Sequence, residues 1–313
     1  MEKRKRKTKP RLRLVIIICC ILLVLSFGMM LGLADYVMRV KRQSLEDAIA
    51  WQSDHYDTSF YDKLEKKDYL VSAEDGYKLH AQLLVNPNPT DRYVILSHGH
   101  TDNHIGSLKY VPMYLRLGFN CIIYDLRAHG ENEQTFVTYG VREGADLYSL
   151  IRDTRERYPE LKTLGLHGES LGAATTISSL KYGAQNPAGF VDFAVADCGF
   201  ADIENVLRGV LKKSRIPSFL VDLADLGARL RYGYAIMKMR PIDSLAENTV
   251  PILFVHGAED DFIPPENSKR MAAATKGMSR ILLVPGATHA MSILTDPETY
   301  EKTLDAFLKD ILK

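Results

Sequence analysis

Two kinds of hydrophobic pattern follow one another along the 313-residue chain. Residues 14–34 contain no charged side chain, and at about 1.5 Å per residue this run matches a bilayer core of about 30 Å. From residue 68 onward, short apolar runs alternate with longer segments in which apolar residues recur every three or four positions. The pattern predicts an N-terminal membrane-spanning helix, followed by a domain in which strands and helices alternate.

The short apolar runs predict about eight strands. The first two flank the turn pair Asp75-Gly76 and predict an antiparallel hairpin, whereas the others are solidly apolar, as buried parallel strands are. The predicted strands are residues 69–73, 79–85, 93–97, 120–124, 163–167, 191–196, 252–256 and 281–284. The predicted helices are residues 106–117, 141–157, 171–182, 265–276 and 296–312. A hairpin followed by strand–helix units implies one α/β domain, whose mainly parallel sheet has helices on both faces.

Two segments fit this alternation less well. The stem, residues 35–67, contains a charged stretch with the only tryptophan, Trp51, and its apolar positions allow either a short amphipathic helix or a plain spacer. Residues 201–240 contain two stretches of helical spacing and more basic than acidic side chains. We interpret them as a small helical cap, whose charges either bind anionic substrates or lipid head groups or merely solvate its helices.

Positive charge is concentrated before the apolar run. Eight Lys or Arg residues fall within residues 1–13, although the formal net charge of the chain is only +1. Fewer basic residues follow the span, so the positive-inside rule predicts a cytoplasmic arm at residues 1–13, a signal anchor at 14–34 and an extracytoplasmic domain. A cleavable signal peptide is the main alternative, but its apolar region is shorter, about 7 to 15 residues. Nucleic-acid binding is disfavoured, because a basic flank beside a span is a topology signal and contacts anionic lipid.

The cysteines and histidines indicate neither a disulfide nor a metal centre. Cys19 and Cys20 lie inside the span, and Cys121 and Cys198 sit on or at the end of apolar runs, which is typical of buried free thiols. The histidines at 98 and 100 have no third ligand of matching spacing. We expect no metal and no cofactor.

One motif carries nucleophile chemistry: Gly168-Glu169-Ser170-Leu171-Gly172. It directly follows the predicted strand 163–167 and precedes an alanine-rich helical segment, which is the setting of a GxSxG nucleophile elbow. The glycines are needed because the serine of such an elbow is held on a strained, crowded turn. The alternative is a serine that merely caps a helix. The motif therefore makes Ser170 the candidate nucleophile.

A serine hydroxyl needs a histidine to accept its proton and a carboxylate to orient that histidine, in the chain order Ser, acid, His. Only His256 and His289 follow Ser170, and only His289 leaves strands and acids between itself and the serine. His256 belongs to a strand-end His-Gly turn and is interpreted as structural. His289 is therefore the candidate general base.

The acid and the oxyanion donors come from two further loops. Glu259, Asp260 and Asp261 all follow the strand 252–256, so three carboxylates compete for one role. The oxyanion of an acyl-transfer reaction needs backbone donors, and the N–H of Leu171, next to the nucleophile, is one. The second is expected in the loop after the third strand, where His100 offers its N–H.

Five motifs in order and spacing carry a family resemblance. They are His98-Gly99-His100-Thr101, Asp125-Leu126-Arg127-Ala128-His129-Gly130, Gly168-Glu169-Ser170-Leu171-Gly172, His256-Gly257-Ala258-Glu259-Asp260 and Gly286-Ala287-Thr288-His289. Together they resemble the α/β-hydrolase superfamily, and within it bacterial membrane-anchored or secreted hydrolases of the serine aminopeptidase and acyl-esterase branch. The resemblance covers about residues 68–313. Ala128 departs from it, because relatives commonly have glycine there.

The resemblance implies an α/β-hydrolase fold and esterase, thioesterase, lipase or peptidase chemistry. It also implies that Asp260, four residues after the strand-end histidine, is the acid, with Asp261 in reserve. We therefore expect a membrane-anchored serine hydrolase that cleaves the acyl bond of a small-molecule or lipid ester or thioester with Ser170, Asp260 and His289. A peptidase with the same triad and a non-catalytic surface-binding module are the alternatives.

Overall fold

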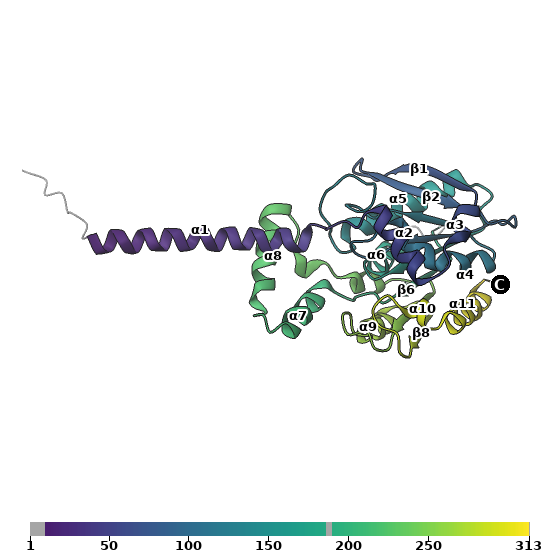
Figure 1. Cartoon of the computed structure of the whole chain (residues 1–313). Helices are drawn as coiled ribbons and strands as arrows, with labels where there is room; N and C mark the ends of the chain where they lie inside the picture. The colour runs from purple at the N-terminus through teal and green to yellow at the C-terminus, as the bar shows by residue number, and fades with distance from the viewer. Residues whose placement is uncertain (1–9, 186–189, 313) are drawn as a thin grey trace, which may run out of the picture.

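A long N-terminal helix projects from a body built around one β-sheet (Figure 1). The computed structural model describes residues 10–185 and 190–312. Helix α1 (Pro10–Met38) extends beyond the predicted span at both ends, and its stretch from Leu12 to Met38 is long and apolar enough to cross a membrane. Only its C-terminal part is covered by the rest of the chain, and Ala34 and Met38 are fully buried there.

The sheet has eight strands, as the sequence predicted. They are β1 (Lys66–Ser72), β2 (Lys78–Leu84), β3 (Arg92–Ser97), β4 (Asn120–Tyr124), β5 (Thr163–Glu169), β6 (Phe193–Asp197), β7 (Ile252–Gly257) and β8 (Ser279–Val284). Their order across the sheet is β1-β2-β4-β3-β5-β6-β7-β8, and β2 alone runs against the others. The carboxyl ends of the parallel strands therefore meet at one edge, where such sheets bind their ligands.

Helices cover both faces of the sheet. They are η1 (His104–Tyr110), α4 (Val111–Arg116), α5 (Val141–Arg157), α6 (Leu171–Gln185), α9 (Glu266–Ala274), α10 (Ser292–Thr295) and α11 (Pro297–Ile311). Strand residues alternate between the two resulting cores, because successive side chains of a strand point to opposite faces. In β4, Ile122 packs into the core beneath α5 and α6, and Ile123 packs into the core beneath α4 and α11.

One predicted helix is interrupted, and a proline explains the break. The predicted helix 106–117 is a 3₁₀-helix, η1, followed by α4, whose first turn contains Pro112. The predicted helix 296–312 is confirmed as α11, which begins at Pro297, and the short α10 precedes it. Proline lacks an N–H and its ring collides with the carbonyl four residues earlier, so a continuous α-helix cannot run through it.

The stem contains helices rather than a plain spacer. Residues 45–55 form α2, and Ser44 caps this helix by accepting the N–H of Asp47 at 3.0 Å. Ala48 and Gln52 are the buried positions of α2. A second, short helix, α3 (Ser59–Lys63), precedes β1.

Residues 201–240 form a helical unit between α1 and the sheet (Figure 1). It consists of α7 (Ile203–Lys213), α8 (Phe219–Tyr232) and a 3₁₀-turn, η2 (Ile236–Lys238), and η3 (Pro241–Leu245) leads back to the sheet. Helix α8 crosses α1 so closely that a Cβ on Gly227 would lie 2.4 Å from the carbonyl oxygen of Met30. The unit also reaches the carboxyl edge of the sheet, where Lys213 and Asp261 form an exposed ion pair of 3.3 Å.

Candidate active site

Ser170 occupies a sharp turn between β5 and α6. Its φ is +53°, in the left-handed region that a residue with a side chain rarely adopts, and its N–H donates to the carbonyl of Asp197 at 2.9 Å. A Cβ on Gly168 would lie 2.1 Å from the carbonyl oxygen of Gly172, and a Cβ on Gly172 would lie 2.0 Å from that of Ser97. The backbone thus approaches itself at both glycines, and the turn presents the serine side chain at the carboxyl edge of the sheet.

Two hydrogen bonds join Ser170 to the histidine and carboxylate that the sequence singled out. Nε2 of His289 lies 3.0 Å from Oγ of Ser170, and Nδ1 of His289 lies 2.7 Å from Oδ2 of Asp260. An ionised carboxylate accepts only, so the Nδ1–H of His289 donates to Asp260. Nε2 is then unprotonated and accepts the hydroxyl proton of the serine. The arrangement can move a proton from Ser170 to His289.

The other two acids of the 259–261 loop do not reach His289. Asp261 is exposed and pairs with Lys213 of α7, and Glu259 is exposed too. Asp260 is buried, and its Oδ1 accepts the N–H groups of Phe262 at 3.0 Å and Ile263 at 2.9 Å. These bonds hold the carboxylate in place while its second oxygen faces the imidazole.

His256 contributes more to the site than a structural turn. Its Nε2 lies 2.7 Å from the carbonyl oxygen of Ile263 and 3.3 Å from Oδ2 of Asp260, and its Nδ1 accepts the hydroxyl of Ser268 at 2.7 Å. Burial alone would raise the pKa of the Asp260 carboxyl, but hydrogen bonds from His256 and His289 outweigh burial and hold that pKa well below its usual range. Asp260 therefore stays ionised beside the imidazole.

The two expected oxyanion donors belong to α6 and to the loop after β3. Leu171 is the first residue of α6, and the N–H groups in the first turn of a helix have no carbonyl partner within that helix. Across from it, the loop after β3 approaches the nucleophile at Gly99, where a Cβ would lie 3.7 Å from Cβ of Ser170. His100 follows, and its ring contacts Tyr139 with centroids 5.8 Å apart.

A buried ion pair behind the nucleophile was not predicted. Nζ of Lys109 lies 2.5 Å from Oε2 of Glu169, the residue before Ser170, and also donates to the carbonyl of Ala290 at 3.0 Å. Burial lowers the pKa of Lys109, but the charge of Glu169 outweighs burial and raises that pKa above its ordinary value. Lys109 thus ties the nucleophile turn to the residue after His289. A lone lysine in an apolar helical segment was the only signal in the sequence.

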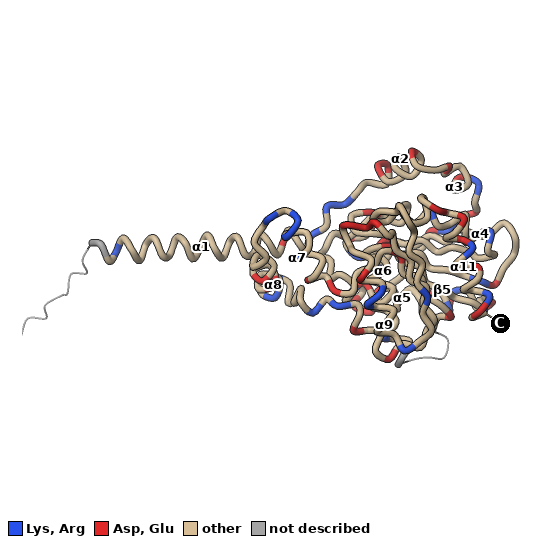
Figure 2. Tube along the Cα trace, turned by 90° about the horizontal axis from the view of Figure 1, so that it is seen from below, with Lys and Arg blue, Asp and Glu red and all other residues tan. Residues whose placement is uncertain are grey.

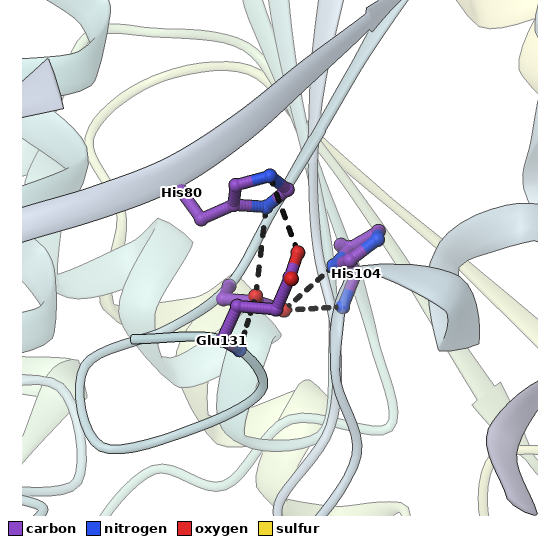
Figure 3. Close-up of side chains that lie close together, drawn as sticks. His80, His104 and Glu131 are labelled. Carbon is purple, nitrogen blue, oxygen red and sulfur yellow. Dashed lines mark hydrogen bonds and ion pairs between the residues drawn. The ribbon is translucent and has the colours of Figure 1, made fainter. Parts of the chain in front are cut away.

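A second set of polar side chains, which includes His80, His104 and Glu131, lies close together (Figure 3) and surrounds Asp125 at the end of β4. His80, His104, Asp125 and Glu131 offer ligand atoms within 4.8 Å of one another, the right residue types for a divalent cation. Oδ1 of Asp125 already accepts the backbone N–H of His104 at 2.8 Å and its Nδ1–H at 2.9 Å, and Oδ2 accepts the N–H of Glu131 at 2.8 Å. We call these four residues the Asp125 cluster, and they join η1 to the loop after β4.

The loop after β4 is held by His98, from the loop after β3, and by Arg127 of the 125–130 motif. Nε2 of His98 accepts the N–H of Leu126 at 3.0 Å, and the guanidinium of Arg127 is buried against Asp146. Burial lowers the pKa of His98 to about 4, so this imidazole is neutral and serves as an acceptor. Ala128 has a φ of +67°, the left-handed conformation for which glycine is suited.

Comparisons with known proteins are consistent with this geometry. The sequence profile of the prolyl oligopeptidase family matches residues 106–313, which contain the three hydrogen-bonded side chains. The uncharacterized protein YqkD of Bacillus subtilis is 31% identical over 279 residues, which are 88% of this chain and 90% of YqkD. The sequence similarity therefore extends well beyond the motifs.

Solved structures share the architecture. The esterase Pf2001 of Pyrococcus furiosus superposes with a TM-score of 0.67 and 22% identity, covering 88% of this chain and 99% of the esterase. An acylaminoacyl peptidase of Pyrococcus horikoshii superposes with a TM-score of 0.58 and 13% identity, covering 82% of this chain and 43% of the peptidase. At these identities the likeness concerns the fold, and it confirms the expected α/β-hydrolase fold.

Proposed function

Because the chain belongs to the prolyl oligopeptidase family and has the α/β-hydrolase fold, we propose that it is a serine hydrolase that cleaves a carboxylic ester or thioester. The observation that carries this proposal is the pair of hydrogen bonds that links Asp260 to His289 and His289 to Ser170. This arrangement activates a hydroxyl that would otherwise be a weak nucleophile at neutral pH.

The reaction proceeds in two steps through an acyl-enzyme. His289 takes the proton of Ser170 as Oγ attacks the acyl carbonyl, and then gives that proton to the departing alcohol or thiol. The N–H groups of His100 and Leu171 stabilise the oxyanion. Water, deprotonated by His289, then attacks the acyl-enzyme, and the acid leaves while Ser170 regains its proton. Asp260 stays ionised and orients the imidazole throughout.

A peptidase is the second candidate, and the match to the prolyl oligopeptidase family favours it. Both activities would use the same three side chains, but a peptidase needs a subsite for the charge or the residues next to the scissile amide. p-Nitrophenyl esters of increasing acyl length, compared with aminoacyl p-nitroanilides on the same preparation, separate the two. A kcat/KM that is higher on the anilides than on the esters would identify the protein as a peptidase rather than an esterase.

The roles of Ser170 and His289 are tested with Ser170→Ala and His289→Ala in the full-length protein. Removing a member of a triad costs about 10⁴-fold or more in kcat, so both variants should lose ester turnover to that extent. A fluorophosphonate probe should label the wild type and not Ser170→Ala. Labelling that persists in Ser170→Ala would place the nucleophile elsewhere, and an unlabelled wild type would favour a non-catalytic binding module.

The apolar helix α1 supports a membrane-anchored form of this enzyme. We propose that it remains uncleaved, with residues 1–13 in the cytoplasm and the sheet domain outside, because basic residues are denser before the span than after it. An anchored chain should stay in the membrane pellet after alkaline carbonate extraction, and protease added to intact spheroplasts should digest it. Release into the medium at a shortened length would identify a signal peptide instead.

A further inference from the structure

Helix α8 carries an apolar stripe that faces away from the protein. Phe219 is 56% exposed, Leu226 48% and Leu230 61%, and Leu223 is half-buried. At 100° per residue these four positions fall within about 60° of the helix circumference, so they form one continuous surface. We call it the α8 stripe. A soluble helix normally turns such a face towards a core, so the α8 stripe needs a partner.

The other faces of α8 explain which way the stripe points. Tyr232 contacts Phe136 of the sheet domain with ring centroids 4.8 Å apart, and Val221, on the same face, is buried. This face lies about 150° around the helix from the α8 stripe. Gly227, on the flank between them, packs against α1. The stripe is therefore directed away from the sheet domain.

The free part of α1 begins beside α8. In both views α8 is the part of the body next to the stretch of α1 that projects freely (Figures 1 and 2). Between Arg13 and Asp35 α1 has no charged residue (Figure 2). The side chains of residues 14–29 are exposed. Residues 12–29 are about 27 Å long, close to the thickness of a bilayer core. If they span it, α8 lies at the level where the chain leaves the membrane.

The end of α1 and the linker that follows it contact loops near the candidate active site. The carbonyl of Met38, the last residue of α1, accepts the N–H of Val137 at 2.8 Å, and the N–H of Gln43 donates to the carbonyl of Thr101 at 2.8 Å. Thr101 follows the expected oxyanion donor His100. The end of α1 and the linker after it are thus hydrogen-bonded to the loops that follow β4 and β3, and about nine residues of helix, or about 14 Å, separate Met38 from the free span.

We propose that the α8 stripe lies in the acyl-chain boundary of the bilayer, and that Ser170 acts on acyl esters dissolved in that bilayer. The stripe would bury apolar area at the membrane surface, as interfacial helices do, while the exposed side chains of Lys212 and Arg215 beside it reach lipid phosphates. This inference rests on the proposed hydrolase function for its substrate class, but not for the position of α8.

The position of α8 is tested by quenching in vesicles. Trp51→Phe removes the native tryptophan, and Leu230→Trp or Leu70→Trp then adds one at positions that are equally exposed, at 61%. Leu70 lies in β1 and serves as the matched control. The full-length variants are placed in phosphatidylcholine vesicles whose acyl chains are brominated near the head group. We expect at least half of the emission at position 230 to be quenched, and under a tenth at position 70.

Equal quenching at the two positions would overturn the proposal. So would an emission at position 230 that is unquenched but shifts to the blue as the protein concentration rises, because a second copy of the chain would then cover the stripe. Both outcomes are independent of catalysis.

The substrate class is tested with Leu226→Glu/Leu230→Glu and the control Leu70→Glu. Hydrolysis of p-nitrophenyl palmitate dissolved in phosphatidylcholine vesicles is divided by hydrolysis of water-soluble p-nitrophenyl acetate. This ratio should fall about tenfold in the α8 variant and stay at the wild-type value in the control, because only the α8 variant places charge in the membrane. An unchanged ratio would refute delivery from the bilayer. A wild type inactive on both esters would refute the proposed esterase activity, while the quenching result would still stand.

Discussion

Two regions of this molecule each surround a buried aspartate with two histidines. In one, Asp260 contacts His289 and His256, and we call these three with Ser170 the Ser170 cluster. In the other, the Asp125 cluster, Asp125 lies between His104 and His80. Both aspartates stay ionised because hydrogen bonds lower their pKa against the effect of burial. The same residue types thus build a chemical site in one place and a loop anchor in the other.

The difference lies in what the histidine of each cluster joins to its aspartate. Nδ1 of His289 is held by Asp260, and its Nε2 meets a hydroxyl on a strained turn at a partly open edge. In the Asp125 cluster, the aspartate takes both the Nδ1–H and the backbone N–H of His104, which fixes η1 to β4. We therefore expect catalysis only from the aspartate–histidine pair of the Ser170 cluster, because the fold places a hydroxyl beside the second nitrogen of its imidazole.

The largest difference between the two clusters is expected when each aspartate is replaced in turn by asparagine. Asp260→Asn should lower kcat on a p-nitrophenyl ester by about 10³ to 10⁴-fold, because the amide favours the wrong tautomer of His289. Asp125→Asn should change kcat less than about tenfold and instead lower the melting temperature. Both quantities are measured on the full-length variants in detergent. Similar kcat losses in the two variants would show that the clusters do not differ in role.

Lys109 offers the next largest effect, because it links the two halves of the Ser170 cluster. Lys109→Met should lower kcat by about 10 to 100-fold and leave KM within about twofold, since the loop of His289 loses its tie to the nucleophile turn. Lys109→Arg should recover part of the rate.

A matched double variant separates positioning from folding. Lys109→Met alone leaves Glu169 as a buried unpaired charge, and Lys109→Met/Glu169→Gln removes that charge. The double variant should regain thermal stability without regaining kcat. Recovery of kcat together with stability would show that Lys109 acts only through the fold.

The sequence could predict the three candidate catalytic residues of the Ser170 cluster, because their positions relative to the predicted strands were enough to place them. Ser170, Asp260 and His289 lie in the turn or loop that follows β5, β7 and β8, and parallel strands bring their carboxyl ends to one edge. Lys109 follows no strand and meets Glu169 only through the packing of η1 against the sheet, which no local pattern records. The position of α8 on α1 likewise depends on close contact at Gly227, which spacing alone does not reveal.

A smaller effect is expected in the way that Asp125 makes the free energy of unfolding depend on pH. Burial would raise the pKa of Asp125, but hydrogen bonding and charge from His104 lower it to about 2. A carboxyl whose pKa is lower in the folded state stabilises above its unfolded pKa, and this stabilisation disappears as the pH falls through the folded pKa. Asp125 should thus contribute about 2 kcal/mol at pH 7 and under about 1 kcal/mol at pH 2.

Denaturant unfolding of the wild type and Asp125→Asn at several pH values measures this difference. The gap in the free energy of unfolding should be constant above about pH 5 and should narrow between about pH 4 and 2. A gap that widens on acidification would mean that Asp125 is protonated in the folded protein.

The smallest effect concerns backbone strain at a left-handed residue in the Ser170 cluster and at another next to the Asp125 cluster. Ala128 has a φ of +67° in the loop after Asp125, and Ser170 has a φ of +53° at the nucleophile turn. Glycine relieves such strain, so Ala128→Gly and Ser170→Gly should each raise the free energy of unfolding by about 0.5 to 1 kcal/mol. Only Ser170→Gly should abolish ester turnover, because the strain at Ala128 supports a loop and the strain at Ser170 presents a nucleophile. Stabilisation at Ala128 with a large loss of kcat would mean that the loop after Asp125 also shapes the active site.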